Sequence, residues 1–284
     1  MPTCVWKNLV CRNGVHKELF GDTTGPDNLF FTKFRDSCWK SIHTDQEFQT
    51  LKITNQALKS RRDMVIHSLK RILTVPDKNN SLPRDDYRQR AALMLTLLGE
   101  TPERGVHWLR PGAAHHAWWM PSILYPAKTF AFSAQAGYDK DMVAKLKSLC
   151  SAVSMHFFYV EKWLNASVDA DAPPYNDLLL WHELNDYKKH DPKVVNAANK
   201  AFDRHFWYLT EECVVLALFS NSLSNRKTKG IAQQLSRIPC PKNFEIGHPR
   251  FPVLTHTTKL VSWLISSVPS PGYRFIACTL ILPG

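Results

Sequence analysis

The sequence predicts a mainly α-helical protein, a helical bundle with a few short strands near its two ends. Two observations support this fold class. Long stretches of the 284-residue chain repeat apolar residues at every third or fourth position, which is the period of an amphipathic helix. Capping residues, glycine or proline stand at the ends of these stretches, where helices begin and end. Beyond Pro239 the chain instead alternates proline with β-branched segments, which favours short strands.

The first 74 residues contain a predicted strand over 5–10, a turn over 21–28 and then helices. Thr44-Asp-Gln-Glu47 has the spacing of a capping box and predicts a helix that runs to about Lys59. Residues 61–73 form a second, basic amphipathic segment. We therefore expect two successive helices here.

The middle of the chain predicts a helix over 84–98, which Gly99 ends. Residues 113–134 have helical composition, but Pro121 and Pro126 each remove a backbone hydrogen bond, so we expect a break or kink. The clearest helix spans 139–165. Its apolar positions are Met142, Leu146, Leu149, Val153, Phe157, Val160 and Leu164.

Further helices follow the Ala172-Pro-Pro174 stop. Asn176 or Asp177 is expected to cap one through His190, and Asp191-Pro192 supplies a cap and a first-position proline for the next. The expected buried residues of that next helix are Val194, Ala198, Ala201, Phe202 and His205. Shorter helices are expected from Thr210 to Phe219 and after Ser224, and strands over 251–255 and 273–282.

The charge of the chain is strongly positive, at +11 with a pI near 9.3. Such a balance favours nucleic acid or an acidic membrane surface as a partner. The cations are partly clustered, and the predicted nucleic-acid contacts are Lys59, Arg61, Arg62, Lys70, Arg71, Arg226, Lys227 and Lys229. A solvated helix face is the alternative interpretation, and it is favoured for either cluster taken alone.

The seven cysteines are odd in number and have no paired spacing. This indicates reduced thiols, hence a nuclear or cytoplasmic protein and not a secreted one. No apolar run approaches the ~20 residues that a membrane-spanning helix needs, so no membrane partner is expected.

The stretch from Arg110 to Met120 reads Arg-Pro-Gly-Ala-Ala-His-His-Ala-Trp-Trp-Met. Adjacent histidines on a helix point about 100° apart, so His115 and His116 cannot both bury on one face. From these residues alone, a helix start with Trp118 and Trp119 as core anchors is favoured. The alternative is that one histidine faces a cleft or a partner.

This stretch resembles the Gly-Ala-x-His-x-Ala-Arg-Trp-Met signature of animal DNA-transposon transposases, an RNase H-like, hAT-like group. Other segments match the group in the same order: Phe20–Pro26, Arg84–Tyr87, Leu97–Gly99, Ala172–Leu178, Ala201–Glu212 (with Trp207) and Pro249–Thr255. The resemblance covers roughly residues 4 to 262. It implies the C-terminal part of a transposase, with its helical insertion. Trp118 in place of the arginine and the dissimilar residues 266–284 indicate a degenerate copy.

Transposases of this kind cut DNA with three carboxylates that hold two divalent ions, Mg²⁺ in intact relatives. The resemblance implies that a strand carrying one of them would precede residue 1, so we expect an incomplete triad. Glu211 is the best candidate for the third carboxylate and Glu212 the alternative, although a first-turn carboxylate that complements the helix dipole is favoured from the residues alone. We expect no catalytic activity and no cofactor. An active nuclease, which metal-dependent nicking would reveal, is the least favoured function.

Two other groups could hold a metal. Cys11-Arg12 resembles the Cys-Arg-His-His segment of the same group, but Asn13 and Gly14 replace the histidines, and Cys11 with His16 alone would rarely hold zinc. His182, Asp186 and His190 share one helical face, but this is also the polar side of an amphipathic helix, and a solvated face is favoured. No metal site is therefore predicted.

These inferences divide the chain into three parts: a remnant of the RNase H-like core with a turn region (1–40), a helical domain (41–237) and an irregular tail with short strands (238–284). The expected function is a transposase-like protein without catalytic activity that binds DNA through basic helices and homodimerises through aromatic helices. The alternative is an α-helical interaction scaffold with no nucleic-acid role. Salt-dependent binding to duplex DNA distinguishes the two.

Overall fold

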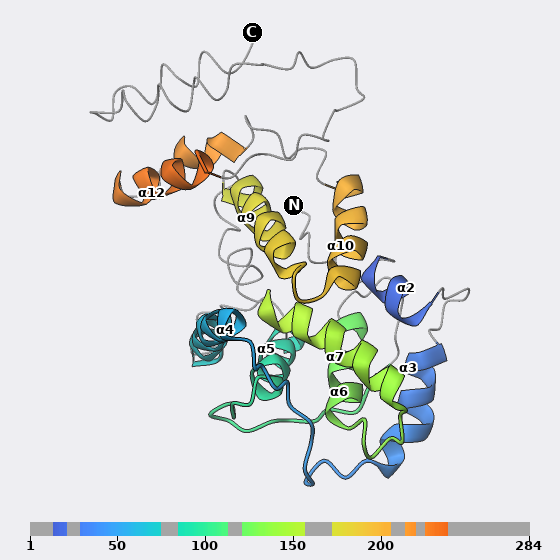
Figure 1. Cartoon of the computed structure of the whole chain (residues 1–284). Coiled ribbons are helices and arrows are strands. Elements are labelled where there is room, and N and C mark those ends of the chain that lie inside the picture. The colour runs from blue at the N-terminus through green and yellow to red at the C-terminus, as the bar shows by residue number, and fades with distance from the viewer. Residues whose placement is uncertain are drawn as a thin grey trace. The chain divides into compact units, whose positions relative to one another are not determined.

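The fold is known from a computed structural model, drawn in Figure 1, in which every regular element of the described residues is a helix. This confirms the mainly helical fold class. The described residues are 14–21, 29–74, 85–112, 121–156, 172–205, 214–219 and 225–237. The strands predicted over 5–10, 251–255 and 273–282 lie outside them.

The chain divides into two compact units. The large unit comprises Thr3–Asn165 and Leu184–Phe202, and the small unit comprises Met1–Pro2, Ala166–Glu183 and Asp203–Gly284. The domain boundaries predicted after residues 40 and 237 stay predictions.

The large unit begins with α2 (Val15–Phe20) and α3 (Leu29–Lys33). The latter continues without interruption as the π-helical turn η1 (Phe34–Cys38) and the 3₁₀ turn η2 (Trp39–Ser41). The side chains of Phe31 and Phe34 pack with Tyr125 in a small core cluster. This N-terminal helix therefore belongs to the hydrophobic core of the large unit.

The capping box predicted at Thr44–Glu47 is wrong, because no helix starts there. Instead α4 spans Gln56–Thr74 as one helix, and the Asn55 side chain accepts hydrogen bonds from Ala57 N and Leu58 N at its start. The preceding segment is held extended by tertiary contacts: Gln49 N donates to Ala131 O, and Leu51 N donates to Leu97 O. These bonds to two other helices outweigh the local capping preference.

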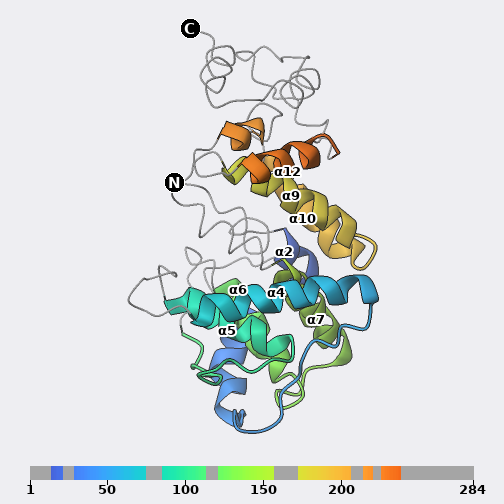
Figure 2. The same cartoon turned by 90° about the vertical axis from the view of Figure 1, so that its left-hand side faces the viewer.

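The remaining helices of this bundle are α5 (Asp85–Leu97), α6 (Pro121–Ala131) and α7 (Lys140–Met155). Each contacts the next, α4 contacts both α5 and α7, and Figure 2 shows the four helices from a second side. The predicted end of α5 is confirmed, since Gly99 follows it with a positive φ of 87°.

The two prolines of α6 behave differently from each other. Pro121 is the first helical residue, where a fixed φ and a missing N–H are tolerated. Pro126 lies inside the helix, so the chain is not broken at that residue, and the kink that was the other expectation stays a prediction. It removes only the bond to the carbonyl four residues before it, close to the helix start. Burial of the neighbouring Tyr125 and Ala127 contributes compensating apolar contact.

The start of α7 is confirmed, because the Asp139 carboxylate accepts a hydrogen bond from Met142 N at 2.7 Å. The helix ends at Met155 with His156 as its C-cap, and the continuation predicted over 157–165 lies outside the described residues.

The last helix of the large unit, α10 (Pro192–His205), begins as predicted: Asp191 accepts from Val194 N at 3.0 Å. Its apolar residues Val194, Ala198, Ala201 and Phe202 are buried, as expected, while the side chain of His205 is not described. Gly14 packs against this helix so closely that an added Cβ would lie 2.9 Å from Ala197 O.

The small unit contains the first part of α9 (Ala172–Tyr187), the 3₁₀ turn η4 (Leu216–Phe219) and α12 (Asn225–Leu235). The cap predicted at Asn176 or Asp177 is wrong, because α9 begins at Ala172 and both side chains are buried within it. Pro173 and Pro174 occupy the first turn, where their missing N–H groups cost little. Thr210 and Ser224 lie outside the described residues.

The core of the small unit joins η4 to α12. The buried side chains of Val215, Leu218 and Ala232 form a cluster, against which Ile231 and Leu235 pack. The Tyr175 hydroxyl donates a hydrogen bond to the Gln234 side chain, which fastens α12 to α9. One face of α12 is therefore occupied by the fold.

The close approach of Gly14 to α10 predicts that Gly14→Ala destabilises the protein. The new methyl group would be forced against backbone at Ala197, and overpacking of this kind costs about 1–3 kcal/mol. Chemical denaturation measures the loss of stability. Gly112→Ala is the matched control, because nothing lies within 4 Å of its added Cβ. Equal stability of the two variants would contradict this packing.

The buried His16 predicts acid lability. Burial lowers the pKa of His16 from 6.5 to about 4, so between these pH values the unfolded chain binds more protons than the folded one. The stabilising contribution of neutral His16 is complete above pH 6.5 and is lost as the pH falls toward 4. Over this range the free energy of unfolding falls by at most about 1.4 kcal/mol per pH unit. Thermal melts over this range test it. His16→Phe, which retains the ring packing on Phe20 and Phe31, should flatten the dependence.

Candidate nucleic-acid interface

The five cations predicted on α4 do not share one environment. Lys59, Lys70 and Arg71 are exposed, whereas Arg61 and Arg62 are half-buried. A side chain whose hydrogen-bond donors are already used inside the protein contributes little to the binding of a partner. We therefore describe the contacts of each cation in turn.

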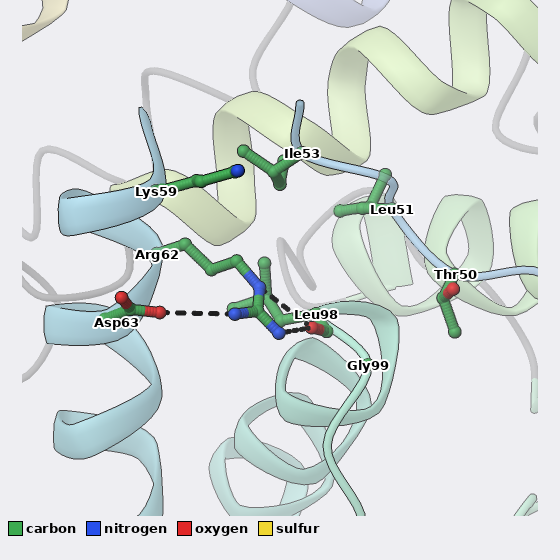
Figure 3. A pocket seen from close by; sticks show the side chains of 8 residues that line it. All are labelled: Thr50, Leu51, Ile53, Lys59, Arg62, Asp63, Leu98 and Gly99. Atoms are coloured by element: carbon green, nitrogen blue, oxygen red, sulfur yellow. Dashed lines mark hydrogen bonds and ion pairs between the residues drawn. The ribbon is translucent and has the colours of Figure 1, made fainter. Parts of the chain in front are cut away.

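The Arg62 side chain makes its hydrogen bonds inside the large unit. Its Nε and Nη2 atoms donate to Leu98 O at 3.2 and 2.7 Å, and Nη1 donates to Asp63 Oδ1 at 3.2 Å (Figure 3). Leu98 is the first residue after α5, so the guanidinium satisfies a carbonyl at the end of that helix. Arg62 therefore fastens α4 to α5, and its donors are occupied.

Lys70 is also paired inside the large unit. Its ammonium donates to Glu100 Oε2 at 2.6 Å, and Arg62 Nη2 lies 3.9 Å from Glu100 Oε1. The hydrogen bond from Lys70, followed by the charges of Lys70 and Arg62, lowers the pKa of Glu100. One carboxylate thus partly neutralises two of the predicted nucleic-acid contacts.

Arg61 is directed toward other helices. The pKa of His156 is lowered to about 3, mainly by burial and further by the charge of Arg61. Burial raises the pKa of Tyr187, and the same arginine opposes that rise. Arg61 therefore lies near the end of α7 and the end of α9. Lys59, by contrast, makes no side-chain hydrogen bond or ion pair with any described residue.

A pocket of about 330 Å³ lies beside Lys59 and Arg62 (Figure 3). Its lining residues are Thr50, Leu51, Ile53, Lys59, Arg62, Asp63, Leu98 and Gly99. Figure 3 shows the Asp63 carboxylate and the Leu98 carbonyl directed at the guanidinium. Arg62 donates to these two acceptors, and the Asp63 carboxylate partly offsets its charge. Lys59 is therefore the lining cation without a described carboxylate partner.

The cations of α12 have a different setting. Arg226 and Lys229 are exposed, and neither forms a hydrogen bond or ion pair within the described part of the chain. The side chain of Lys227 is not described. The sequence between Glu212 and Glu245 contains no Asp or Glu, so no nearby carboxylate in sequence competes for these cations. They lie on the helix opposite the face that packs on η4.

A second group of exposed cations was missed by the sequence prediction: Lys188, Lys189, Lys193 and Lys200, on α10 and the turn before it. The sequence does carry a signal for two of them. Lys193 and Lys200 are seven residues apart, which places them on one face of a helix, and the apolar residues lie on the other.

Several predicted site residues lie outside the described residues and cannot be placed: Cys11, Arg12, His115, His116, Trp119, Trp207, Glu211 and Glu212. The candidate carboxylates and the family-like motif residues therefore stay predictions.

The prediction that His182, Asp186 and His190 share one helical face is wrong for His190. The helix α9 ends at Tyr187, and His190 lies in the following turn. Within the described ranges, no group of three or more His, Cys, Asp or Glu side chains could hold a metal ion. None of the helices described there is long and apolar enough to cross a membrane.

The contrast between Arg62 and Lys59 can be tested by mutation. Arg62→Gln removes charged donors from Leu98 O and should lower the free energy of unfolding by about 1–3 kcal/mol. Lys59→Gln, an exposed change three positions away, should stay within roughly 0.5 kcal/mol of the wild type. Urea titrations measure both. If the two variants proved equally stable, Arg62 would not be the link between α4 and α5.

Comparisons with known proteins found no matching family model, curated protein or solved structure. Function is therefore inferred from the charges and contacts of this chain.

Proposed function

We propose that this protein binds nucleic-acid duplexes through the exposed cationic face of α12. The supporting observation is the environment of Arg226 and Lys229, which are solvent-exposed and have no described partner. The other face of the helix is buried, because Ala232 of α12 packs in a cluster with Val215 and Leu218. A rigid helix that presents only cations and neutral polar groups suits the regularly charged phosphate backbone.

The position of the charges within α12 strengthens this proposal. Arg226 and Lys227 lie in the first turn of the helix, where the backbone dipole is positive. Cations at that end oppose the dipole and destabilise the helix by a few tenths of a kcal/mol or more each. A phosphate bound beside them would offset this repulsion, which gives the arrangement a physical reason.

The proposed contacts are to the backbone and carry no sequence specificity, since phosphate contacts position a protein without reading bases. We further propose that the chain is transposase-like, because its motifs occur in the same order as those of the transposase group. Cleavage of DNA is not part of the proposal, because only Glu211 and Glu212 are candidates for a metal-binding triad.

Salt-dependent binding to duplex DNA tests the proposal. Fluorescence anisotropy with a labelled duplex between about 50 and 200 mM salt should show a steep loss of affinity. The triple variant R226Q/K227Q/K229Q should bind more weakly at every salt concentration. Its log–log salt slope should be shallower by about 0.9 for each phosphate that the variant no longer neutralises.

The matched control is K33Q/K40Q/K52Q, which removes the same charge from exposed lysines of the large unit. It should retain most of the affinity. No binding by the wild type at low salt, or equal losses in the two triple variants, would contradict the proposed role of α12.

A further inference from the structure

The lysines around α10 form a basic stripe on the large unit. We define it as Lys188, Lys189, Lys193 and Lys200, on α10 and on the turn that joins it to α9 (yellow in Figure 1). All four are exposed, and none makes a side-chain hydrogen bond or ion pair with a described residue. Between Lys193 and Lys200 the exposed residue is Asn196, so this part of the outer face carries only polar and cationic side chains.

Between Lys188 and Lys200 the only carboxylate in the sequence is Asp191, whose oxygens accept hydrogen bonds within the fold. Asp203 follows later in α10, and its side chain is not described. The Oδ1 atom of Asp191 accepts from Val194 N at 3.0 Å, and its Oδ2 atom accepts from the Ser148 hydroxyl of α7. Both oxygens are thus engaged at the helix start. Asp191 therefore directs its oxygens to the backbone of α10 and to Ser148, and it forms no ion pair with the lysines of the stripe.

The stripe is also rigidly positioned. Asn199 Nδ2 donates to Asn185 Oδ1 at 2.9 Å, and His190 N donates to Tyr187 O at 2.8 Å, so both sides of the turn are held. Gly14 packs against Ala197 on the inner side of α10. A preorganised set of cations loses less conformational entropy on binding than lysines on a flexible loop.

We propose that the basic stripe is a second contact for the phosphate backbone of a nucleic-acid duplex, in the large unit, in addition to α12. This inference rests on the proposed function. The spacing agrees with it: Lys193 and Lys200 are about 10 Å apart along the helix. Each strand of a duplex carries one phosphate per about 3.4 Å of the duplex axis, so several phosphates lie within the span of the two lysines.

The burial of α10 argues against a membrane as the partner. A helix that binds an acidic bilayer needs a free apolar face to insert beneath the headgroups. The apolar face of α10 is instead occupied, since Val195, Ala198 and Phe202 are each at most 1% exposed. The basic stripe can therefore bind a polyanion by electrostatic contact, without inserting an apolar face.

A duplex that contacts both surfaces of one chain is bound bivalently. The second contact then forms within an existing complex, at the effective concentration set by the first, so affinity rises without any change in either surface. Removal of either surface should therefore weaken binding strongly, and removal of both should weaken it most.

The experiment compares full-length variants by duplex anisotropy at about 100 mM salt. K188Q/K189Q/K193Q/K200Q should lose roughly tenfold or more in affinity and have a shallower salt slope. The control K33Q/K40Q/K52Q/K140Q removes the same charge from other exposed lysines and should lose much less. Circular dichroism confirms that each variant is folded. The double variant K193E/K200E reverses two charges on one face of α10 and serves as a second test. It should lose more affinity than the control.

The outcomes separate the two proposals. If the α12 variant loses affinity while the stripe variant binds like its control, the second contact is refuted and the proposed function stands. If the wild type binds no duplex, both are refuted. Anionic phosphatidylserine vesicles form the last arm: stripe-dependent binding to vesicles but not to duplex would overturn the assignment to nucleic acid.

Discussion

The guanidinium of Arg62 lies between α4 and the end of α5, and its hydrogen bonds to Leu98 O hold the two helices together. Neighbouring contacts meet the same end of α5. The extended segment before α4 is joined to the same region through Leu51 N and Leu97 O, and Lys70 pairs with Glu100 just beyond it. A helix that is rich in cations thereby uses several of them to stabilise its own packing.

This constraint separates two kinds of basic residue in one sequence. Donors that are saturated by a carbonyl or a carboxylate have exchanged their hydration for an internal partner, so their release to a ligand would cost free energy. Exposed ammonium and guanidinium groups without such partners carry no comparable cost. Arg62 belongs to the first kind, and Arg226, Lys229 and the basic stripe belong to the second. Lys70 lies between the two kinds, because it pairs with Glu100 but is 51% exposed.

The distribution of acidic residues follows the same logic. Glu100 is placed beside Lys70 and Arg62, and Asp191 caps α10 while it accepts a bond from Ser148. Carboxylates thus occur where they stabilise a helix end or an ion pair, and they are missing from the sequence around α12.

The sequence by itself determined the helical class, the start of α7 at Asp139, the cap of α10 at Asp191 and the end of α5 at Gly99. These features depend on residues within a few positions of one another, so local chemistry suffices. Tertiary structure alone decided that the chain after Thr44 stays out of a helix and which cations have an internal partner. Thr44–Glu47 has the right spacing for a cap, but bonds from Gln49 and Leu51 to distant helices hold the following chain extended. Likewise, only the approach of α5 shows that Arg62 is occupied, because its acceptor lies 36 residues away in the sequence.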